Sequence, residues 1–341
     1  MLNTIYRLTK PRHFELEFSD IDLNTDEVIV RPTHLSICNA DQRYYQGRRA
    51  PEVLAKKLPM ALIHEGIGKV VHDNSGEFKP GETVVMIPNT PYEEDPYIAE
   101  NYLRSSKFRA SGFDGFMQGF VPMRRDRIVR LPEEVDKDVA AFTEINSVAY
   151  HAVDRFFKFS HERRDRIVVW GDGNLAFLVS LILSYRLPES EICIVGIDED
   201  KLLRFSFADK TYLVSELDDD FTFDHGFECV GGEGSPMAIN CMIDLIKPEA
   251  TISILGVSEN PVPINTRMVL EKGLRIFGSS RSGREDFENT VKFYVEHPEA
   301  VGYLSSIVGQ VVDVRNIDDA NSAFEKDIYK AYGKTVMHWN I

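Results

Sequence analysis

The chain has 341 residues, of which 43% are hydrophobic and 27% are charged, a composition typical of a globular protein with about two domains. Lys and Arg number 39 against 54 Asp and Glu, which gives a formal net charge of -15. This charge argues against nucleic acid or an anionic membrane as a partner, so an anionic substrate would need a local basic pocket.

No targeting or membrane segment is evident in the sequence. The first residues contain no apolar signal region, and the longest apolar stretch, residues 175–185, is shorter than the ~20 residues of a membrane span. The cysteines, Cys38, Cys193, Cys229 and Cys241, are too few and too widely spaced for a disulfide framework. We therefore expect a cytoplasmic protein without a membrane partner.

Short strands dominate the first part of the chain. Residues 26–38, 59–71 and 77–88 are rich in Val, Ile and Leu and are separated by Gly, Pro and Asp turns. Residues 89–115 are polar and contain glycine, which indicates a long surface excursion. Residues 1–148 are therefore expected to form a mainly β domain.

From about residue 150 the pattern changes to apolar strands that alternate with helices. Strands are expected at residues 166–170, 192–196, 223–232, 250–256 and 274–278. This alternation is typical of a doubly wound parallel sheet, so the fold class is α/β and residues 149–280 form the second domain. Residues 281–341, which end in a strand at 333–339, are expected to return to the first domain.

A glycine-rich loop follows the first strand of the second domain. Gly171, Gly173, Asn174, Leu175 and Ala176 lie in a G-x-G-x-x-A run that opens an apolar helix. The first glycine allows a tight turn, the second lets the backbone approach a pyrophosphate, and the alanine keeps helix and sheet close. The helix N-terminus favours the negative charge, so this loop predicts a dinucleotide site.

The tip of the second strand selects between NADH and NADPH. An NAD enzyme places an acid there, but this tip carries Gly196, which removes a charge that would repel a 2′-phosphate. Lys201 and Arg204 follow on the next helix and supply cations. We therefore favour NADPH, and the alternative is that Asp198 serves as the ribose-binding acid of an NADH enzyme.

Three metal-binding side chains occur at the ends of predicted strands in the first domain. Cys38, His64 and Glu65 offer a thiol, an imidazole and a carboxylate, a donor set that suits zinc. His64 and Glu65 can share one metal if the backbone turns there, and Gly66 and Gly68 make such a turn inexpensive. Taken singly, the thiol would by default be a buried core residue, and an isolated His-Glu pair is more often a surface or capping feature.

Several motifs together resemble the medium-chain zinc dehydrogenases in identity and order. They are Cys38 with Asp41 and Gly47, residues 64–68 (HEGIG), residues 79–84 (KPGETV), the G-x-G-x-x-A loop and residues 228–232 (ECVGG). Longer stretches, such as ICNADQRYYQG, KLPMALIHEGIG and GSSRSG, resemble the ribulose-5-phosphate reductases that supply ribitol 5-phosphate for CDP-ribitol, teichoic acid and capsule synthesis. This second resemblance is the more specific of the two.

The resemblance implies a GroES-like catalytic domain interrupted by a Rossmann domain, with a catalytic zinc. Carried over by position, the zinc ligands and catalytic residues are Cys38, His64, Glu65 and Glu144. We assign the thiol and the imidazole as fixed ligands and the two glutamates as adaptable ones. Without the resemblance, Glu144 would be interpreted as a carboxylate at a helix N-terminus.

The chain departs from the family pattern in three places. Residues 90–110 contain no cysteine for a second, structural zinc, so one catalytic zinc per chain is expected. Ala40 and Arg43 stand where relatives carry a hydroxyl and a histidine for proton relay. Arg43 either pairs with a substrate phosphate or forms a surface ion pair, and Tyr44 either offers its hydroxyl to the substrate or packs as an aromatic residue. Ile63 replaces the glycine that usually precedes His-Glu.

These observations predict a reductase that converts D-ribulose 5-phosphate to D-ribitol 5-phosphate with NADPH and zinc. The alternatives are an NAD-dependent polyol dehydrogenase, acting on a free sugar alcohol such as xylitol or sorbitol, and a crystallin-like protein that binds NADPH without catalysis. A small sugar phosphate is the expected ligand. A homodimer is the expected assembly, and a cytidylyltransferase of the same pathway is a candidate partner.

Overall fold

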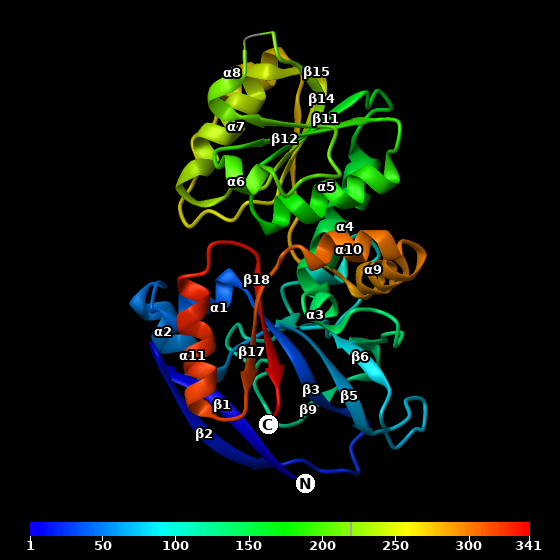
Figure 1. Cartoon of the computed structure of the whole chain (residues 1–341), viewed down its shortest axis with the longest axis vertical. Coiled ribbons are helices and arrows are strands. Elements are labelled where there is room, and N and C mark those ends of the chain that lie inside the picture. The colour runs from blue at the N-terminus through cyan, green and yellow to red at the C-terminus, as the bar shows by residue number, and fades with distance from the viewer. Residues whose placement is uncertain (219) are drawn as a thin grey trace. The chain divides into compact units, whose positions relative to one another are not determined.

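The computed structural model describes residues 1–218 and 220–341, and this part of the chain divides into two compact units. Met1–Ser147 and Ser282–Ile341 form the first unit, and Val148–Arg281 form the second (Figure 1). The helix α4 (Thr143–Phe159) contains the first boundary. No helix of the described residues is both long enough and apolar enough to cross a membrane.

A large, mostly antiparallel sheet forms the centre of the first unit. Its strands are, in spatial order, β10 (Ile128–Arg130), β6 (Thr83–Met86), β5 (Glu65–His72), β3 (Val28–Ile37), β18 (Lys334–Trp339) and β17 (Val308–Val314). β9 (Val121–Met123) also pairs with β3, and β17 runs parallel to β18. The last strand of the chain thus pairs with β3, with Thr335 opposite Ile37 and His338 opposite His34.

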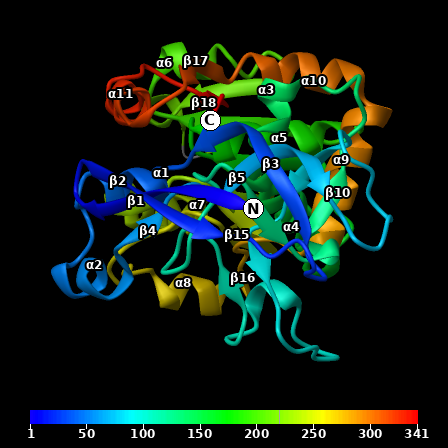
Figure 2. The same ribbon diagram turned by 90° about the horizontal axis from the view of Figure 1, so that it is seen from below.

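Smaller elements surround this sheet. β1 (Leu2–Lys10) pairs with β2 (His13–Asp20) and with β4 (Met60–Ala61), while β7 (Asn89–Thr90) and β8 (Lys107–Phe108) form a ribbon inside the polar segment. The helices are α1 (Asn39–Tyr45), α2 (Pro51–Lys57), α3 (Lys137–Ala140), α9 (Arg284–Glu296), α10 (Pro298–Ser305) and α11 (Ile317–Ile328). Short 3₁₀ turns occur at Glu100–Tyr102 and Arg125–Arg127. Figure 2 shows α11 beside β17 and β18.

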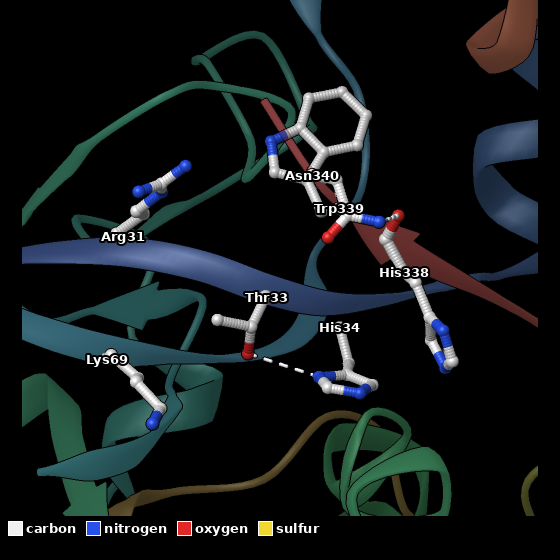
Figure 3. A pocket seen from close by; sticks show the side chains of 7 residues that line it. All are labelled: Arg31, Thr33, His34, Lys69, His338, Trp339 and Asn340. Carbon is white, nitrogen blue, oxygen red and sulfur yellow. Dashed lines mark hydrogen bonds between the residues drawn. The ribbon is translucent and has the colours of Figure 1, made fainter. Parts of the chain in front are cut away.

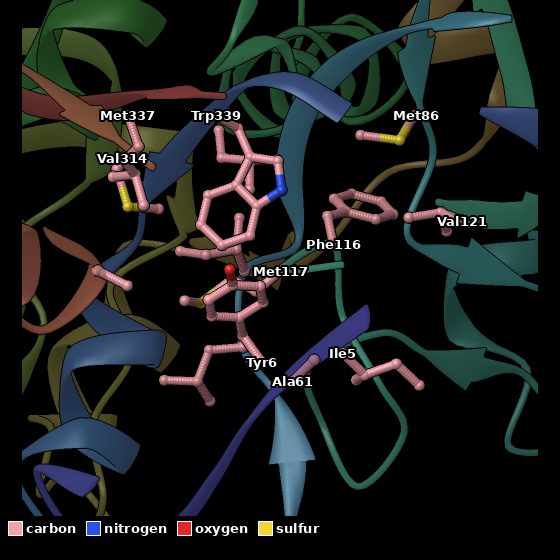
Figure 4. Close-up of a cluster of buried hydrophobic side chains, with 14 of the residues drawn as sticks. Ile5, Tyr6, Ala61, Met86, Phe116, Met117, Val121, Val314, Met337 and Trp339 are labelled. Carbon is pink, nitrogen blue, oxygen red and sulfur yellow. The ribbon is translucent and has the colours of Figure 1, made fainter. Parts of the chain in front are cut away.

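The core of the first unit follows from the two-residue repeat of its strands. Leu35, Met337 and Trp339 all face one buried cluster, because alternate side chains of a strand point to the same side (Figure 4). Trp339 packs edge-on against Tyr6 of β1 with 5.0 Å between ring centroids. Burying each such side chain contributes about 1.5–3 kcal/mol, which ties the C-terminal strand to the N-terminal hairpin.

The second unit is a doubly wound parallel sheet. Its strands are, in spatial order, β13 (Lys210–Leu213), β12 (Glu191–Gly196), β11 (Arg166–Trp170), β14 (Phe223–Glu228), β15 (Ile246–Ile254) and β16 (Arg275–Gly278). In chain order this is 3-2-1-4-5-6, the order of a dinucleotide-binding sheet, so the predicted α/β fold class is confirmed.

Helices connect these strands and bury their apolar faces on the sheet. They are α5 (Asn174–Arg186), α6 (Glu199–Leu202), α7 (Ser235–Leu245) and α8 (Thr266–Glu271), with 3₁₀ turns at Val214–Glu216 and Gly232–Gly234. α5 packs on β11 and β12, and α7 packs on β14 and β15. Val168, Ile239 and Met242 belong to the resulting core.

Candidate active site

The junction of β3 and α1 positions Cys38. This residue is the N-cap of α1, and its backbone N–H donates a hydrogen bond of 3.2 Å to Oδ2 of Asp41 in the first helical turn. The hydrogen bond fixes the path of the chain as the strand becomes a helix. The thiol therefore lies at the carboxyl end of β3 with a defined backbone geometry.

A strained turn precedes His64 and Glu65. Ile63 has φ of +69°, a left-handed conformation that costs a β-branched residue about 1–2 kcal/mol. Two hydrogen bonds hold it: its N–H donates to Oδ1 of Asp41 at 3.0 Å, and its carbonyl accepts from the N–H of Phe116 at 2.7 Å. The backbone therefore turns at Ile63, directly before His64.

Gly66 and Gly68 do not form the turn that the sequence predicts for them. Both lie inside β5, where a Cβ at Gly66 would meet the carbonyl oxygen of His34 at 3.0 Å, and one at Gly68 would meet that of Arg31 at 2.5 Å. They allow β3 and β5 to approach closely. The expectation that these glycines make the turn is therefore corrected.

These local structures bring three potential ligands together. The ligand atoms of Cys38, His64 and Glu65 all lie within 4.8 Å of one another. Glu65 is fully buried and His64 is 6% exposed. A thiol, an imidazole and a carboxylate match the S, N and O ligands of a catalytic zinc, which keeps a further position open for substrate or water.

Asp41 contacts both the backbone around this cluster and the ring of His64. Its carboxylate, which is 1% exposed, accepts the two backbone hydrogen bonds described above and lies 3.5 Å from Nδ1 of His64. Burial alone would lower the pKa of His64, but the negative charges of Asp41 and Cys38 outweigh burial and raise it well above its usual range. Carboxylates in this position orient the imidazole of a metal-binding histidine.

Lys334, the first residue of β18, contacts Glu65 directly. Its ammonium lies 2.8 Å from Oε1 and 2.7 Å from Oε2 of Glu65, and the lysine side chain is 3% exposed. Burial lowers the pKa of Lys334, but the charge of Glu65 outweighs this and raises it. The sequence gives no sign of this role for Lys334, because nothing in the GKTVMHW strand indicates its partner.

Glu144 lies in the first turn of α4 and is 7% exposed. Burial and the charge of Glu65 raise the pKa of Glu144 to about 7, although His64 and Lys334 act in the opposite direction. It lies near the cluster but is not among the residues whose ligand atoms all lie within 4.8 Å of one another. Buried carboxylates of this kind are costly unless a cation balances them, so the donor set fits a divalent ion.

Arg43 and Tyr44 follow Cys38 on α1. Tyr44 is 3% exposed and belongs to the hydrophobic core, which favours its role as a packed aromatic residue. The guanidinium of Arg49 lies 4.9 Å from the centre of the Tyr44 ring, and the ammonium of Lys57 lies 5.8 Å from it. Burial and the charge of Arg49 lower the pKa of Arg43, so cations gather around this helix.

The loop between β11 and α5 has the geometry of a phosphate-binding turn. Gly171 has φ of +130°, and a Cβ there would meet the backbone of Cys229 at 3.1 Å, so the residue must be glycine. A Cβ at Gly173 would enter open space, which leaves the loop accessible. Asn174 and Leu175 begin α5, and Ala176 is fully buried against the sheet. This arrangement presents backbone N–H groups of a helix N-terminus to a phosphate.

β12 ends at Gly196, but the space beside that residue is not empty. A Cβ at Gly196 would meet Cβ of Asp172 at 2.9 Å, because the carboxylate of Asp172 accepts hydrogen bonds from the N–H groups of Ile197 at 2.9 Å and Asp198 at 3.1 Å. The glycine therefore accommodates Asp172, and the expectation that it leaves room for a 2′-phosphate is corrected.

The charged groups after β12 are tied to one another. Asp198 caps α6 by accepting from the N–H of Lys201 at 3.2 Å. The ammonium of Lys201 lies 3.4 Å from Asp198 and 3.8 Å from Asp172. Arg204 lies in the turn after α6. Lys201 thus lies between two carboxylates close to the tip of β12.

Comparisons with protein families agree with this combination of sites. Residues 24–133 match the model of the alcohol dehydrogenase GroES-like domain, and residues 205–296 match that of the zinc-binding dehydrogenases. The protein is thus a zinc-dependent oxidoreductase of the medium-chain dehydrogenase superfamily, as the sequence motifs predicted.

Individual relatives identify the family within this superfamily. The chain is 54% identical over 341 residues to a ribulose-5-phosphate reductase of Bacillus spizizenii, with 100% of both chains covered. It is 50% identical over 339 residues to ribulose-5-phosphate reductase 1 of Staphylococcus aureus, with 99% of both covered. The crystal structure of S. aureus TarJ in complex with NADPH superposes with a TM-score of 0.91 at 45% identity and complete coverage of both chains. The chain belongs to the ribulose-5-phosphate reductase family.

Proposed function

We propose that this protein reduces the C2 ketone of D-ribulose 5-phosphate to the secondary alcohol of D-ribitol 5-phosphate, using NADPH and a catalytic zinc. The buried cluster of Cys38, His64 and Glu65 carries the proposal, together with the full-length identity to reductases of that name. When bound, zinc polarises the ketone oxygen and stabilises the developing alkoxide, and NADPH supplies the hydride. The product would serve CDP-ribitol formation for teichoic acid or capsule synthesis.

The residues of the cluster have distinct proposed roles. Cys38 and His64 hold the zinc, and Asp41 fixes the orientation of His64. Glu65 and Glu144 are the adaptable ligands, since carboxylates exchange more readily than a thiolate. Lys334 gives the charge of Glu65 a second partner, so Glu65 remains paired when substrate occupies its place.

Substrate phosphate recognition is assigned to the cations that gather around α1. Arg43 lies five residues after Cys38, and the charge of Arg49 affects its pKa, which places both near one another. In a chain of net charge -15 such a gathering supports an anion site. Arg109 is a poor candidate, because its guanidinium donates to the carbonyls of Asp114 at 3.3 Å and Pro122 at 2.7 Å.

The cofactor assignment uses the loop from Gly171 to Ala176 for the pyrophosphate and Lys201 with Arg204 for the 2′-phosphate. A homodimer and a partnership with a cytidylyltransferase remain part of the proposal, supported by the resemblance to the reductase family. A cytoplasmic location is proposed because the reaction consumes NADPH. Tyr44 is left with a packing role, and a proton reaching the product alkoxide would then come from water.

Steady-state kinetics test the function directly. Rates with ribulose 5-phosphate and with dephosphorylated ribulose, each with NADPH and with NADH, should show a strong preference for the phosphorylated sugar and for NADPH. Equal rates with both sugars would contradict the phosphate assignment and favour a polyol dehydrogenase. Absence of both zinc and turnover in protein purified without chelator would favour a protein that binds NADPH without catalysis.

A further inference from the structure

Three neighbouring strands of the first unit place two histidines and an aspartate side by side. His338 of β18 is opposite His34 of β3 in the antiparallel pair and opposite Asp313 of β17 in the parallel pair. The neighbours of these residues, such as Leu35 and Met337, face the hydrophobic core, so the two histidines and Asp313 lie on the other face of the sheet.

Asp138 of α3 completes this group. Nε2 of His338 lies 2.8 Å from Oδ1 of Asp138, and the rings of His34 and His338 meet edge-on with 4.7 Å between centroids. The ligand atoms of His34, Asp138 and His338 all lie within 4.8 Å of one another. We propose that these three residues form a second metal site, for a divalent transition-metal ion such as zinc, separate from the catalytic site.

The chemistry of the group favours a transition metal. Two imidazoles and one carboxylate are ligands that zinc and its neighbours prefer, whereas magnesium and calcium require oxygen atoms. Two ligands about 2.1 Å from one ion lie at most about 4.2 Å apart, so small side-chain rotations suffice to bind it. The ion would take the position between the imidazoles and Asp138 that a hydrogen bond now spans.

Each imidazole also has a partner that orients it. Nδ1 of His34 is 3.1 Å from Oγ1 of Thr33, and Nδ1 of His338 is 3.5 Å from Oδ1 of Asp313. Metal-binding histidines characteristically engage their second nitrogen with a hydroxyl, carbonyl or carboxylate in this way. In both residues Nε2 is then the nitrogen available to the metal.

A pocket gives access to the group. It has a volume of about 370 Å³, and His34 and His338 line it together with Thr33, Arg31 and Lys69 (Figure 3). The side chains of His338 and Asp138 are 35% and 31% exposed. An ion can therefore enter from solvent, and water molecules have room to complete its coordination.

The two metal sites share no ligand. His34 lies on β3, four residues before Cys38 at the N-cap of α1, and four residues of extended chain span roughly 13 Å. The expectation of one catalytic zinc per chain is unaffected, because the second site contains none of the proposed catalytic ligands. Binding at either site can therefore be measured without the other.

The experiment is equilibrium dialysis of the full-length protein against buffered zinc, followed by metal analysis. We expect two zinc ions per chain in the wild type and one in the H34Q/H338Q variant, which should retain reductase activity. The C38S variant should also bind one zinc, but without activity. H72Q, which alters a histidine bonded to Leu23 and Asn74 outside both clusters, should still bind two.

Cobalt distinguishes the sites by their ligands. The first site contains a thiolate and should give a sulfur-to-metal charge-transfer band, while the second equivalent should add d–d absorption without that band. Wild-type protein that saturates at one zinc per chain would overturn the proposal, as would an H34Q/H338Q variant that still binds two. A D138N variant, with the same expected loss, provides the test if the double variant fails to fold.

Discussion

The ammonium of Lys334 donates a hydrogen bond of 2.8 Å to Oε1 of Glu65 and lies 2.7 Å from Oε2, and both side chains are almost completely buried. The two residues are 269 positions apart in the chain and meet because β18 returns beside β3, next to β5. The pair neutralises one of the carboxylates that surround His64. A proposed zinc ligand is thus already held by a protein cation.

Replacing this lysine should expose the competition between it and zinc. In K334M without metal, Glu65 is left buried and unpaired, so the free energy of unfolding should fall by about 3–5 kcal/mol. Zinc should bind more tightly than in the wild type and restore most of the loss. Chemical denaturation with and without zinc measures both effects.

K247M is the matched control, since Lys247 also pairs with a buried carboxylate, that of Asp224 in the second unit. It should lose stability without changing the response to zinc. If K334M instead binds zinc more weakly than the wild type, Lys334 supports the metal site and does not compete for Glu65.

Asp41 should determine zinc affinity through His64. In D41N the carboxylate 3.5 Å from Nδ1 of His64 becomes a neutral amide, and zinc affinity should fall about 10- to 100-fold. Competition with a chromophoric chelator gives the affinity. D73N is the control. It also replaces with an amide a buried carboxylate that accepts backbone hydrogen bonds, here from Ser75 and Phe78, and it should leave zinc affinity unchanged. Equal affinities for D41N and the wild type would remove Asp41 from the site.

The sequence predicted the three metal ligands but not the contacts that hold them in place. Cys38, His64 and Glu65 were found because their types and order resemble a family motif. That Ile63 makes the turn was missed because isoleucine rarely adopts a positive φ. This residue is held by the hydrogen bond that its N–H donates to Asp41 and by the one that its carbonyl accepts from the N–H of Phe116. Tertiary contacts of this kind leave no local pattern.

The second unit was more predictable, for a physical reason. Its strands are buried on both faces and alternate with helices, so each appears as an apolar run that hydrophobicity alone identifies. The exception is Gly196. The sequence shows that its side chain is absent but not that Asp172 occupies the neighbouring space, because the two residues meet only across the strand ends.

Arg43 should recognise the phosphate of the substrate. In R43M the KM for ribulose 5-phosphate should rise roughly 10- to 150-fold, the equivalent of about 1.5–3 kcal/mol for a hydrogen bond to a charged group. The rate with dephosphorylated ribulose should stay the same. R48M removes a neighbouring exposed arginine and serves as the control. Equal losses of activity with both sugars would mean that Arg43 stabilises the fold and does not bind the phosphate.

Lys201 should favour NADPH over NADH. Because its ammonium lies near the tip of β12, the K201A variant should raise the KM for NADPH about tenfold, about 1.4 kcal/mol, and leave the KM for NADH unchanged. K210A, which removes an exposed lysine paired with Glu191 on the adjacent strand, should change neither value. An equal rise in the KM for both cofactors would show that Lys201 maintains the conformation of the loop and does not bind the 2′-phosphate.

Acid should destabilise the second unit through His225. Burial, with the neighbouring His161, lowers the pKa of His225 to about 3, and Nδ1 of His225 accepts a hydrogen bond of 3.1 Å from the N–H of Thr251. A proton on Nδ1 would face that donor. The unfolded chain takes up this proton near pH 6.5 and the folded chain does not, so the stability present above about pH 6.5 is lost as pH falls toward 3.

The loss should approach about 1.4 kcal/mol per pH unit below about pH 6. H225N keeps an acceptor for Thr251 but has no titratable ring. The slope of its free energy of unfolding against pH should therefore be smaller than that of the wild type by about 1.4 kcal/mol per pH unit. Urea denaturation between about pH 7.5 and 5 measures the slope. H13N, an exposed histidine in the first unit, should retain the wild-type slope. Identical slopes for H225N and the wild type would mean that His225 becomes protonated in the folded protein without cost.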